Sequence, residues 1–236
     1  EWLGGVRLES LAGVAPLRWG RLGTLGGQIN LLHASDLPRT DATGIQYGTF
    51  AYRDLAVRAA YGRLIGETLS AGGVLTFLSE TIDDASGAAV ALDVGFQSRP
   101  RRWVTLGAVM QHIGTPLAVG GSGYPHPITL REGVTVKIHR RRSARDVVLL
   151  SLEGTQAAFG ASDLRGGVEI WPVRRLALRF GYRTRLASHP LGSSVGLSGG
   201  LGVSQGPHWV FDYAFVPFGF SGGLGLTHRA SLGYRF

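Results

Sequence analysis

The sequence lacks cysteine, has a single lysine (Lys137), and contains no long apolar run. Without cysteine, a disulfide framework and a thiolate metal site are both excluded. Charged residues make up 17% of the chain, compared with about 25% in soluble proteins. No window approaches the roughly 18 consecutive apolar residues of a transmembrane helix. A closed β-barrel is the other structure that pairs every backbone polar group in lipid.

Glycine and arginine are abundant instead. The 37 glycines are roughly double the usual share and, with only 10 prolines, indicate many tight turns rather than disorder. The net charge of +8 gives a sequence pI near 10.5. Nucleic-acid binding would need a basic face or a known module, whereas these arginines alternate along strands or cluster in turns. We therefore expect no nucleic-acid partner.

The C-terminal stretch from Trp209 to Phe236 carries the clearest membrane pattern. Ala230, Leu232, Tyr234 and Phe236 share one face of an extended strand, and the arginines of this segment fall on the other. Outer-membrane barrels alternate apolar-out with polar-in and place aromatic residues at the water interface. We predict a closing strand over Leu226 to Phe236. In it, Leu232, Tyr234 and Phe236 form the signal for the barrel-assembly machinery.

The same period of two recurs along the chain. From Arg175 to Leu186, apolar residues alternate with arginines, which a helical period would scatter around the axis. Near the start, Leu8 alternates with Arg7 and Glu9, and the pair Arg53-Asp54 predicts a tight hairpin turn. We count about fourteen strands of roughly 8–13 residues. The predicted fold is all-β, a transmembrane antiparallel up-and-down β-barrel that forms one domain over residues 1–236. We expect its outer surface to contact outer-membrane lipid. Because Glu1 follows no leader, we expect that a signal peptide is not included.

Charged residues on the polar side of these strands are the candidate lumen residues. They could bind an anionic solute, or they could pair with each other, with water or with a plug, because barrel interiors are polar whatever they carry. By the same alternation, Glu9 and Arg235 also fall on the polar side. Glu132 falls on an apolar side, and the pattern does not explain a charged residue there. The candidates are Arg58, Asp93, Arg131, Arg179, Arg183, Asp212 and Arg229.

A second group of arginines lies in turns. If the C-terminus is periplasmic, the turns at 99–102, 139–145 and 172–175 fall on the periplasmic side, whereas the opposite loops are nearly free of arginine. The group could bind anionic headgroups or a protein partner, or it could simply anchor turns at the interface. This candidate periplasmic rim consists of Arg101, Arg102, Arg140, Arg141, Arg142 and Arg174.

Enzyme chemistry has little support in the sequence. The seven histidines form neither a His-Glu-x-x-His motif nor an i, i+4 pair, so we expect no metal site. Gly192 to Gly196 matches the spacing of a nucleophile elbow but lies in a Gly/Ser-rich strand pattern with no helix after it. We expect a protein that is not an enzyme and that needs no cofactor.

Several blocks resemble the PorV/PorQ outer-membrane proteins, which are FadL-like barrels. They are GVRLESLAGVAPL at 5–17, SETIDDASGAAVALDVGF at 79–96, LGAVMQHIG at 106–114, GGVEIWP at 166–172, LALRFGYR at 176–183, and DYAFVPFG with LGLTHRASLGYRF at the end. The family normally opens with a Gly/Ala-rich segment ending in Asn-Pro-Ala, which is expected to lie in the barrel as a plug and is absent here. The family also often has an acidic residue after Pro-Phe-Gly, where this chain has Phe220-Ser221-Gly222.

The resemblance implies a location in the bacterial outer membrane and two alternative roles. PorV-like proteins serve type IX secretion, so one role is a protein-binding adaptor or a subunit of an envelope complex with protein partners. FadL-like proteins pass hydrophobic molecules through the barrel wall, so the alternative is a channel for hydrophobic or small anionic solutes.

Overall fold

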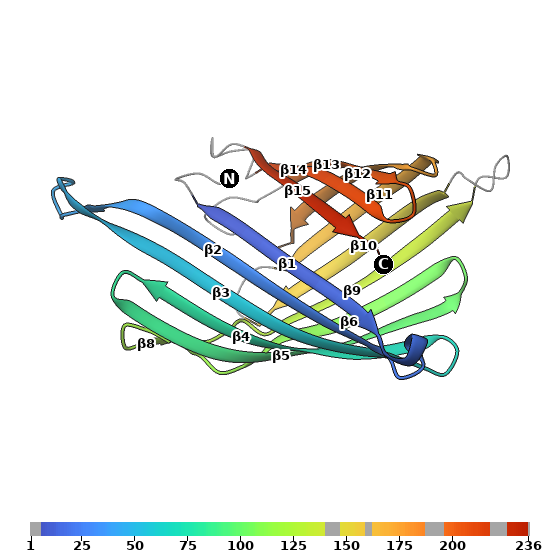
Figure 1. The fold of residues 1–236 in the computed structure, drawn as a ribbon, viewed down its shortest axis with the longest axis horizontal. Helices are drawn as coiled ribbons and strands as arrows, with labels where there is room; N and C mark the ends of the chain where they lie inside the picture. Colours follow the sequence, from blue (N-terminus) through green and yellow to red (C-terminus); the bar gives the residue numbers. More distant parts are fainter. Residues whose placement is uncertain (1–5, 140–146, 159–161, 187–195, 218–225, 236) are drawn as a thin grey trace. The chain divides into compact units, whose positions relative to one another are not determined.

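The computed structural model describes residues 6–139, 147–158, 162–186, 196–217 and 226–235, and almost all of them lie in antiparallel β-strands (Figure 1). A 3-10 helix, η2 (Leu17–Gly20), connects the first two strands. Within the described residues, no helix is long and apolar enough to cross a membrane. The strands are β1 (Arg7–Pro16), β2 (Thr24–Thr40), β3 (Gln46–Ile65), β4 (Leu69–Ile82), β5 (Ala85–Arg101), β6 (Val104–Gly114), β7 (Leu117–Val119), β8 (Ser122–Tyr124), β9 (Thr129–His139), β10 (Val147–Ala157), β11 (Asp163–Val173), β12 (Leu176–Arg185), β13 (Gly196–Gln205), β14 (Trp209–Pro217) and β15 (Leu226–Tyr234).

The strand order follows the sequence. Thirteen strands form one sheet in the order β1-β2-β3-β4-β5-β6-β9-β10-β11-β12-β13-β14-β15, and β7 pairs with β8 in a separate small hairpin. This up-and-down order agrees with the predicted architecture and with the count of about fourteen strands. Since successive strands run antiparallel, the connections after β10, β12 and β14 lie at one end of the sheet, and those after β9, β11 and β13 lie at the other.

Two compact units divide the sheet. Unit 1 contains residues 1–96 and 109–129, and unit 2 contains residues 97–108 and 130–236. Along each strand, neighbouring side chains point to opposite faces. We call the face that carries Arg58 in unit 1, and the face that carries Arg179 in unit 2, the polar face of that unit. The opposite face is its apolar face.

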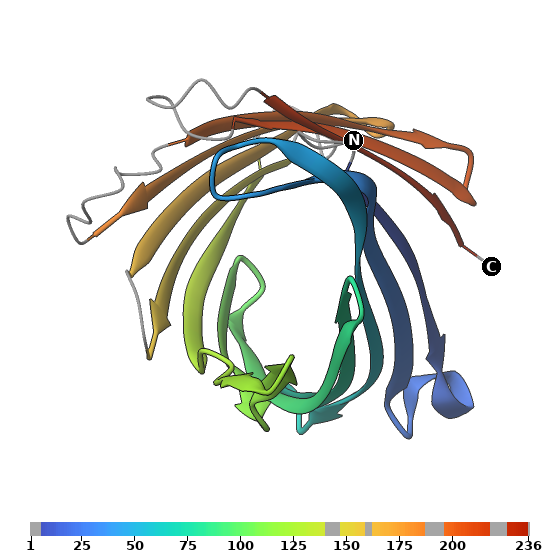
Figure 2. The same ribbon diagram turned by 90° about the vertical axis from the view of Figure 1, so that its left-hand side faces the viewer.

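Unit 1 is built on two long strands. β2 and β3 pair from Thr24–Gly62 to Thr40–Gln46, and the ribbon extends beyond the last β3–β4 pair, Tyr52–Ile82. Figure 2 shows this ribbon, in blue, reaching past the neighbouring strands of the unit. The hairpin β7–β8 lies in the Gly/Pro-rich connection after β6, and β7 contacts β4.

The predicted hairpin at Arg53-Asp54 is wrong. β3 runs through both residues, because Arg53 pairs with His33 on one side and Thr81 on the other, and Asp54 pairs with Leu32 and Glu80. Both residues therefore have a complete set of neighbouring strands, and the pair of adjacent charges simply sends one side chain to each face.

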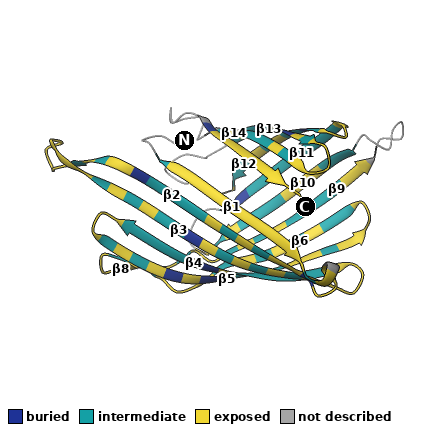
Figure 3. Cartoon of the chain, in the orientation of Figure 1, coloured by how far each residue is buried: buried dark blue, intermediate teal, exposed yellow. Residues whose placement is uncertain are grey.

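The predicted orientation of the first strand is also wrong. Leu8 shares a face with Ser10, which pairs with Asn30 on the polar face, whereas Glu9 pairs with Leu31 on the apolar face. Glu9 lies 3.8 Å from His33 on that face. β1 is exposed along its whole length (Figure 3), so burial does not distinguish its two faces.

Unit 2 follows the predicted alternation closely. Leu178 pairs with Ile170 and Leu201 on the apolar face, and Arg179 pairs with Glu169 and Gly200 on the polar face. Large apolar-face side chains are exposed, Phe180 by 60%, whereas the small polar-face residue Ala177 is completely buried. The apolar surface thus faces outward from the sheet without a covering layer, as expected for a lipid-facing surface.

The last strand, β15, pairs with β14 from Trp209–Tyr234 to Pro217–Leu226. Leu232 and Tyr234 lie on the apolar face, as the alternation predicted, and Phe236 lies outside the described residues. The Tyr234 ring packs edge-on against Trp209, with centroids 4.8 Å apart, and stacks on His208. Their role as an assembly signal stays a prediction.

Candidate functional site

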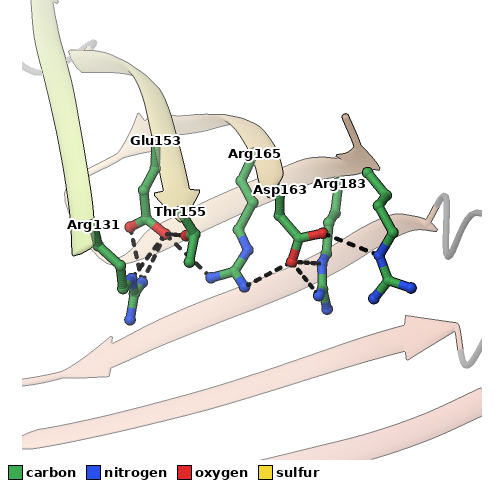
Figure 4. A network of polar contacts seen from close by, with 7 residues as sticks. Arg131, Glu153, Thr155, Asp163, Arg165 and Arg183 are labelled. Carbon is green, nitrogen blue, oxygen red and sulfur yellow. Dashed lines mark hydrogen bonds and ion pairs between the residues drawn. The ribbon is translucent and has the colours of Figure 1, made fainter. Parts of the chain in front are cut away.

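The polar face of unit 2 carries a group of paired charges near the connections that follow β10 and β12 (Figure 4). Glu153 accepts hydrogen bonds from Arg131 Nη2 at 2.7 and 2.9 Å and from Arg165 Nη1 at 3.1 Å. Glu153 and Arg165 pair directly across β10 and β11, and Arg165 pairs with Arg183 on β12. One carboxylate therefore lies between two guanidinium groups. We call the whole group the arginine cluster: Arg131, Glu153, Asp163, Arg165, Arg183 and Arg185.

Asp163 is the buried centre of the arginine cluster. Its side chain is 8% exposed, and Arg183 donates to its Oδ2 from Nε at 3.1 Å and also from Nη2. Arg165 Nη2 lies 3.8 Å from the same oxygen, and Arg185 Nε lies 3.6 Å from Oδ1. Three guanidinium groups therefore surround one carboxylate.

A second ion-pair group lies on the same face, two rows away. Arg179 donates from Nε to Glu169 Oε2 at 2.6 Å and from Nη1 to Asp212. Trp171 Nε1 donates to the other oxygen of Glu169 at 2.5 Å. One guanidinium thus binds both carboxylates, so this group carries two negative charges and one positive charge.

Between these two groups the polar face of unit 2 is hollow. Residues Ser151, Gly167, Gly181 and Ser198 form a row of small side chains across four strands, and a cavity of about 570 Å³ lies there. The cavity is bordered by Arg179, Asp212 and Arg229. The side chain of Arg229 makes no hydrogen bond or ion pair with any residue that the structure describes. The cavity exists because glycine and serine side chains are too short to fill it.

On the polar face of unit 1, Arg58 is hydrogen-bonded to amide groups instead of carboxylates. Arg58 Nη1 donates to the amide oxygen of Gln28 at 3.4 Å and, with the Asn30 amide oxygen turned toward it, to Asn30 at 2.6 Å. Gln28 pairs with Arg58 across β2 and β3, and Thr76 pairs with Arg58 on β4. The hydrogen-bond partners of the Arg58 guanidinium are thus neutral amides.

Asp93 and two histidines border the same region. Asp93 Oδ1 accepts a hydrogen bond from the backbone N–H of His112 at 2.8 Å. His112 has a φ of 63°, a left-handed conformation that is uncommon for a residue with a side chain, and the carboxylate helps to hold it. The ring of His126 lies 6.4 Å from that of His112. Within the described residues, no group of three His, Asp or Glu side chains could hold a metal ion.

One row of the unit 1 polar face is apolar. Val14, Gly26, Ala60 and Val74 are paired across β1, β2, β3 and β4, and Val14 is 78% exposed. The row adjoins the one that contains Arg58. A cavity of about 630 Å³ spans both rows and is bordered by the charged side chains of Arg58 and Asp93 and by the apolar side chains of Val14, Val74 and Leu78.

All seven candidate lumen residues lie on the polar face of their unit, but they do not form one site. Arg58 and Asp93 border the unit 1 cavity, and Arg131 and Arg183 belong to the arginine cluster. Arg179 and Asp212 are bonded to each other, and Arg229 borders the unit 2 cavity. Whether these faces line a lumen stays a prediction.

Sequence reasoning missed Glu153, Asp163, Arg165 and Glu169, although they carry much of the network. The available signal was alternation: Ser151, Glu153 and Thr155 are polar at every second position of β10. The Gly/Ala-rich stretch just before Asp163 has the composition of a loop, whereas β11 begins at Asp163. Among the rim arginines, Arg101 ends β5, and Arg102 and Arg174 lie in turns; Arg140, Arg141 and Arg142 are outside the described residues.

Comparison with known proteins found similarity in structure but not in sequence. No family model matches the chain, and no curated protein matches it. A crystal structure of the toluene transporter TodX of Pseudomonas putida superimposes with a TM-score of 0.61 at 13% identity, covering 96% of this chain and 83% of that one. A second crystal structure of TodX gives a TM-score of 0.59 at 13% identity, covering 88% and 74%.

These matches lend no support to the specific resemblance to PorV/PorQ proteins. At this identity the likeness concerns the fold alone, and it agrees with the strand order and with the two-faced strands. The chain has the fold of a FadL-like transmembrane antiparallel β-barrel.

Proposed function

We propose that this chain is a channel of the bacterial outer membrane for small hydrophobic molecules. The observation that carries the proposal is the apolar row Val14, Gly26, Ala60 and Val74 on the polar face of unit 1. Barrel interiors are generally polar, so an apolar row beside a cavity of about 630 Å³ is out of place unless it serves an apolar ligand.

The physical role of the row is to offer a place where an apolar molecule leaves water. Burying apolar surface is favourable by about 25 cal/mol per Å², and a small contact area keeps the binding weak enough for release. The fold likeness to a protein described as a toluene transporter supports the same class of solute. The matches found are solute transporters, so the channel replaces the secretion adaptor as the function that we propose.

Uptake of radiolabelled toluene by cells with an intact outer membrane tests the proposal. Cells that express the chain should take up toluene faster than cells with an empty vector. Val74→Asp places a carboxylate in the apolar row and should lower this gain by about fivefold or more, because an apolar solute then displaces water from a charge. Uptake no faster than with the empty vector, despite a folded barrel in the outer membrane, would refute the channel.

The matched control is Ala214→Asp, which adds the same carboxylate to the polar face of unit 2. Ala214 pairs with Gly200 and lies at the unit 2 cavity. Because Arg179 and Arg229 border the same cavity, the new charge has cations nearby and should leave most of the uptake in place. An equal loss in both variants would show that the apolar row has no special part.

A further inference from the structure

The arginine cluster contains more positive than negative charge. It contains four guanidinium groups and two carboxylates, and the ion pairs between its described residues all go to Glu153 or Asp163; guanidinium groups stay protonated in proteins. Two positive charges are therefore left without a counter-charge inside the cluster. Like charges held this close repel each other unless an anion joins them.

Among the described residues of unit 2, no other carboxylate pairs with the cluster, and Asp146 lies outside the described residues. Glu169 and Asp212 are held by Arg179, and Glu132 lies on the apolar face beside Gly154. The three connections at this end of unit 2, residues 158–162, 187–195 and 218–225, contain no Asp or Glu in their sequences. The described residues of unit 2 therefore supply no counter-charge for the cluster beyond Glu153 and Asp163.

Open hydrogen-bonding groups in the cluster show where an anion would bind. Arg185 Nε is buried without a hydrogen-bond partner and lies 3.6 Å from Asp163 Oδ1, beyond hydrogen-bond distance, so this donor is open. Arg183 uses Nε and Nη2 for Asp163, which leaves Nη1. Figure 4 shows the guanidinium groups of Arg131, Arg165 and Arg183 directed to the same side. Their side chains are partly exposed, with Arg183 at 43%.

We propose that the arginine cluster is a binding site for a small oxyanion with two negative charges, of the phosphate type. Guanidinium groups bind such oxyanions through paired N–H donors in a planar fork. Arg183 and Arg185 lie two residues apart on β12 and so project from the same face about 7 Å apart, a spacing that lets both side chains bend onto one tetrahedral group. The site goes beyond the proposed channel and does not depend on transport.

Equilibrium dialysis of the purified full chain with radiolabelled inorganic phosphate tests the site. The protein is held in a non-ionic detergent at about pH 8, where phosphate is mainly a dianion. We expect saturable binding of about one phosphate per chain, and Arg185→Gln should weaken it about tenfold or more, the loss of one charge-assisted hydrogen bond. Glycerol phosphate as competitor identifies the source: displacement at similar concentrations indicates a phosphate ester site, and weak displacement indicates a site for free phosphate.

The matched control is Arg229→Gln, which removes the same charge from the same face outside the arginine cluster. It should change the affinity by less than about twofold. Absence of saturable binding, or an equal loss in Arg229→Gln and Arg185→Gln, would overturn the site, because the second result would mean a general effect of net charge.

Glu153→Gln keeps the proposal testable if Arg185→Gln does not fold. Removing this carboxylate raises the positive excess while keeping the side-chain shape, so phosphate should bind severalfold more tightly, by roughly 1 kcal/mol. Unchanged or weaker binding in a correctly folded Glu153→Gln would contradict the charge argument. Toluene uptake by the same variants is measured separately, so failure of the channel and failure of the oxyanion site are distinguishable.

Discussion

The polar faces of the two units hold their charges in different ways. In unit 2, Arg179 and the arginines of the arginine cluster form ion pairs with carboxylates. In unit 1, Arg58 is bonded to the amide of Gln28 instead. The surrounding rows differ too, because the row beside Arg58 is apolar, whereas the row beside Arg179 consists of glycine and serine.

The charge balance also differs between the two faces. On the unit 1 polar face, Arg58 lies in a strand region that also carries the carboxylates of Asp54, Glu80 and Asp93, and the second cation, Arg39 near the end of β2, is paired with Asp83. The unit 2 polar face has an excess of guanidinium groups. Since the sheet backbone repeats the same pairing in both units, the side-chain rows alone create two environments: one with an apolar row beside a cation and one with more guanidinium groups than carboxylates.

The largest expected effect concerns the apolar faces, where the two units should behave alike. Phe180 in unit 2 is 60% exposed and Phe77 in unit 1 is 46% exposed. Replacing either with Arg should lower the free energy of unfolding in lipid vesicles by about 2–4 kcal/mol if the position lies near the bilayer midplane. Urea unfolding in lipid measures it. A loss in one unit only would mean that the other unit does not face lipid there.

Alternation along the strands was predictable from the sequence, and unit 2 shows why. From Leu176 to Arg185 the period of two is unbroken, so each side chain was assigned to the correct face. The prediction of faces from alternation was wrong in β1, where Leu8 and Glu9 lie on the faces opposite to those predicted. In that strand the face is decided by the pairing with β2, and pairing is a property of two strands that one strand's pattern does not contain.

Predicting the ion pairs would also have required the pairing of neighbouring strands, which the sequence pattern of one strand does not contain. Arg179 and Asp212 were found because each lies in a strand with strong alternation, but their contact requires the register of β12, β13 and β14. Asp163 follows a Gly/Ala-rich stretch that has the composition of a loop, so its strand position was missed. The apolar row of unit 1 could not be predicted from the sequence either, because its four residues come from four different strands.

The next effect separates the two polar faces. Arg179→Met leaves Glu169 and Asp212 next to each other without their shared cation, and should lower the free energy of unfolding by roughly 1 kcal/mol, a value reduced for the partial exposure of these side chains. Urea unfolding of the variant measures this loss. Adding Glu169→Gln to Arg179→Met should recover part of it, because one unpaired charge is removed. No recovery in the double variant would mean that the carboxylates are not coupled through Arg179.

A smaller effect is expected for the equivalent change in unit 1. Arg58→Met removes a cation whose hydrogen-bond partners are the neutral amides of Gln28 and Asn30, and no carboxylate loses a bonded partner. The free energy of unfolding should fall by a few tenths of a kcal/mol, in the range of an exposed polar contact. The same urea titration compares both variants. A loss as large as that of Arg179→Met would contradict the difference drawn between the two polar faces.

The smallest effect lies outside both polar faces, in the turn between β2 and β3. A hydrogen bond from Thr43 Oγ1 at 2.6 Å, followed by one from the Ile45 N–H at 2.9 Å, lowers the pKa of the Asp41 carboxyl. A lowered pKa in the folded state means that the carboxylate stabilises the turn above its unfolded pKa, and that this contribution is lost as the pH falls through the folded value. Asp41→Ala should therefore speed hydrogen exchange at the Ile45 amide near neutral pH, and the difference from the unchanged chain should shrink at acidic pH. Exchange at Ser79, which lies in β4 and is paired with Leu55, serves as the internal reference and should not change. Faster exchange at both amides would mean that the substitution loosens the sheet of unit 1 rather than the turn alone.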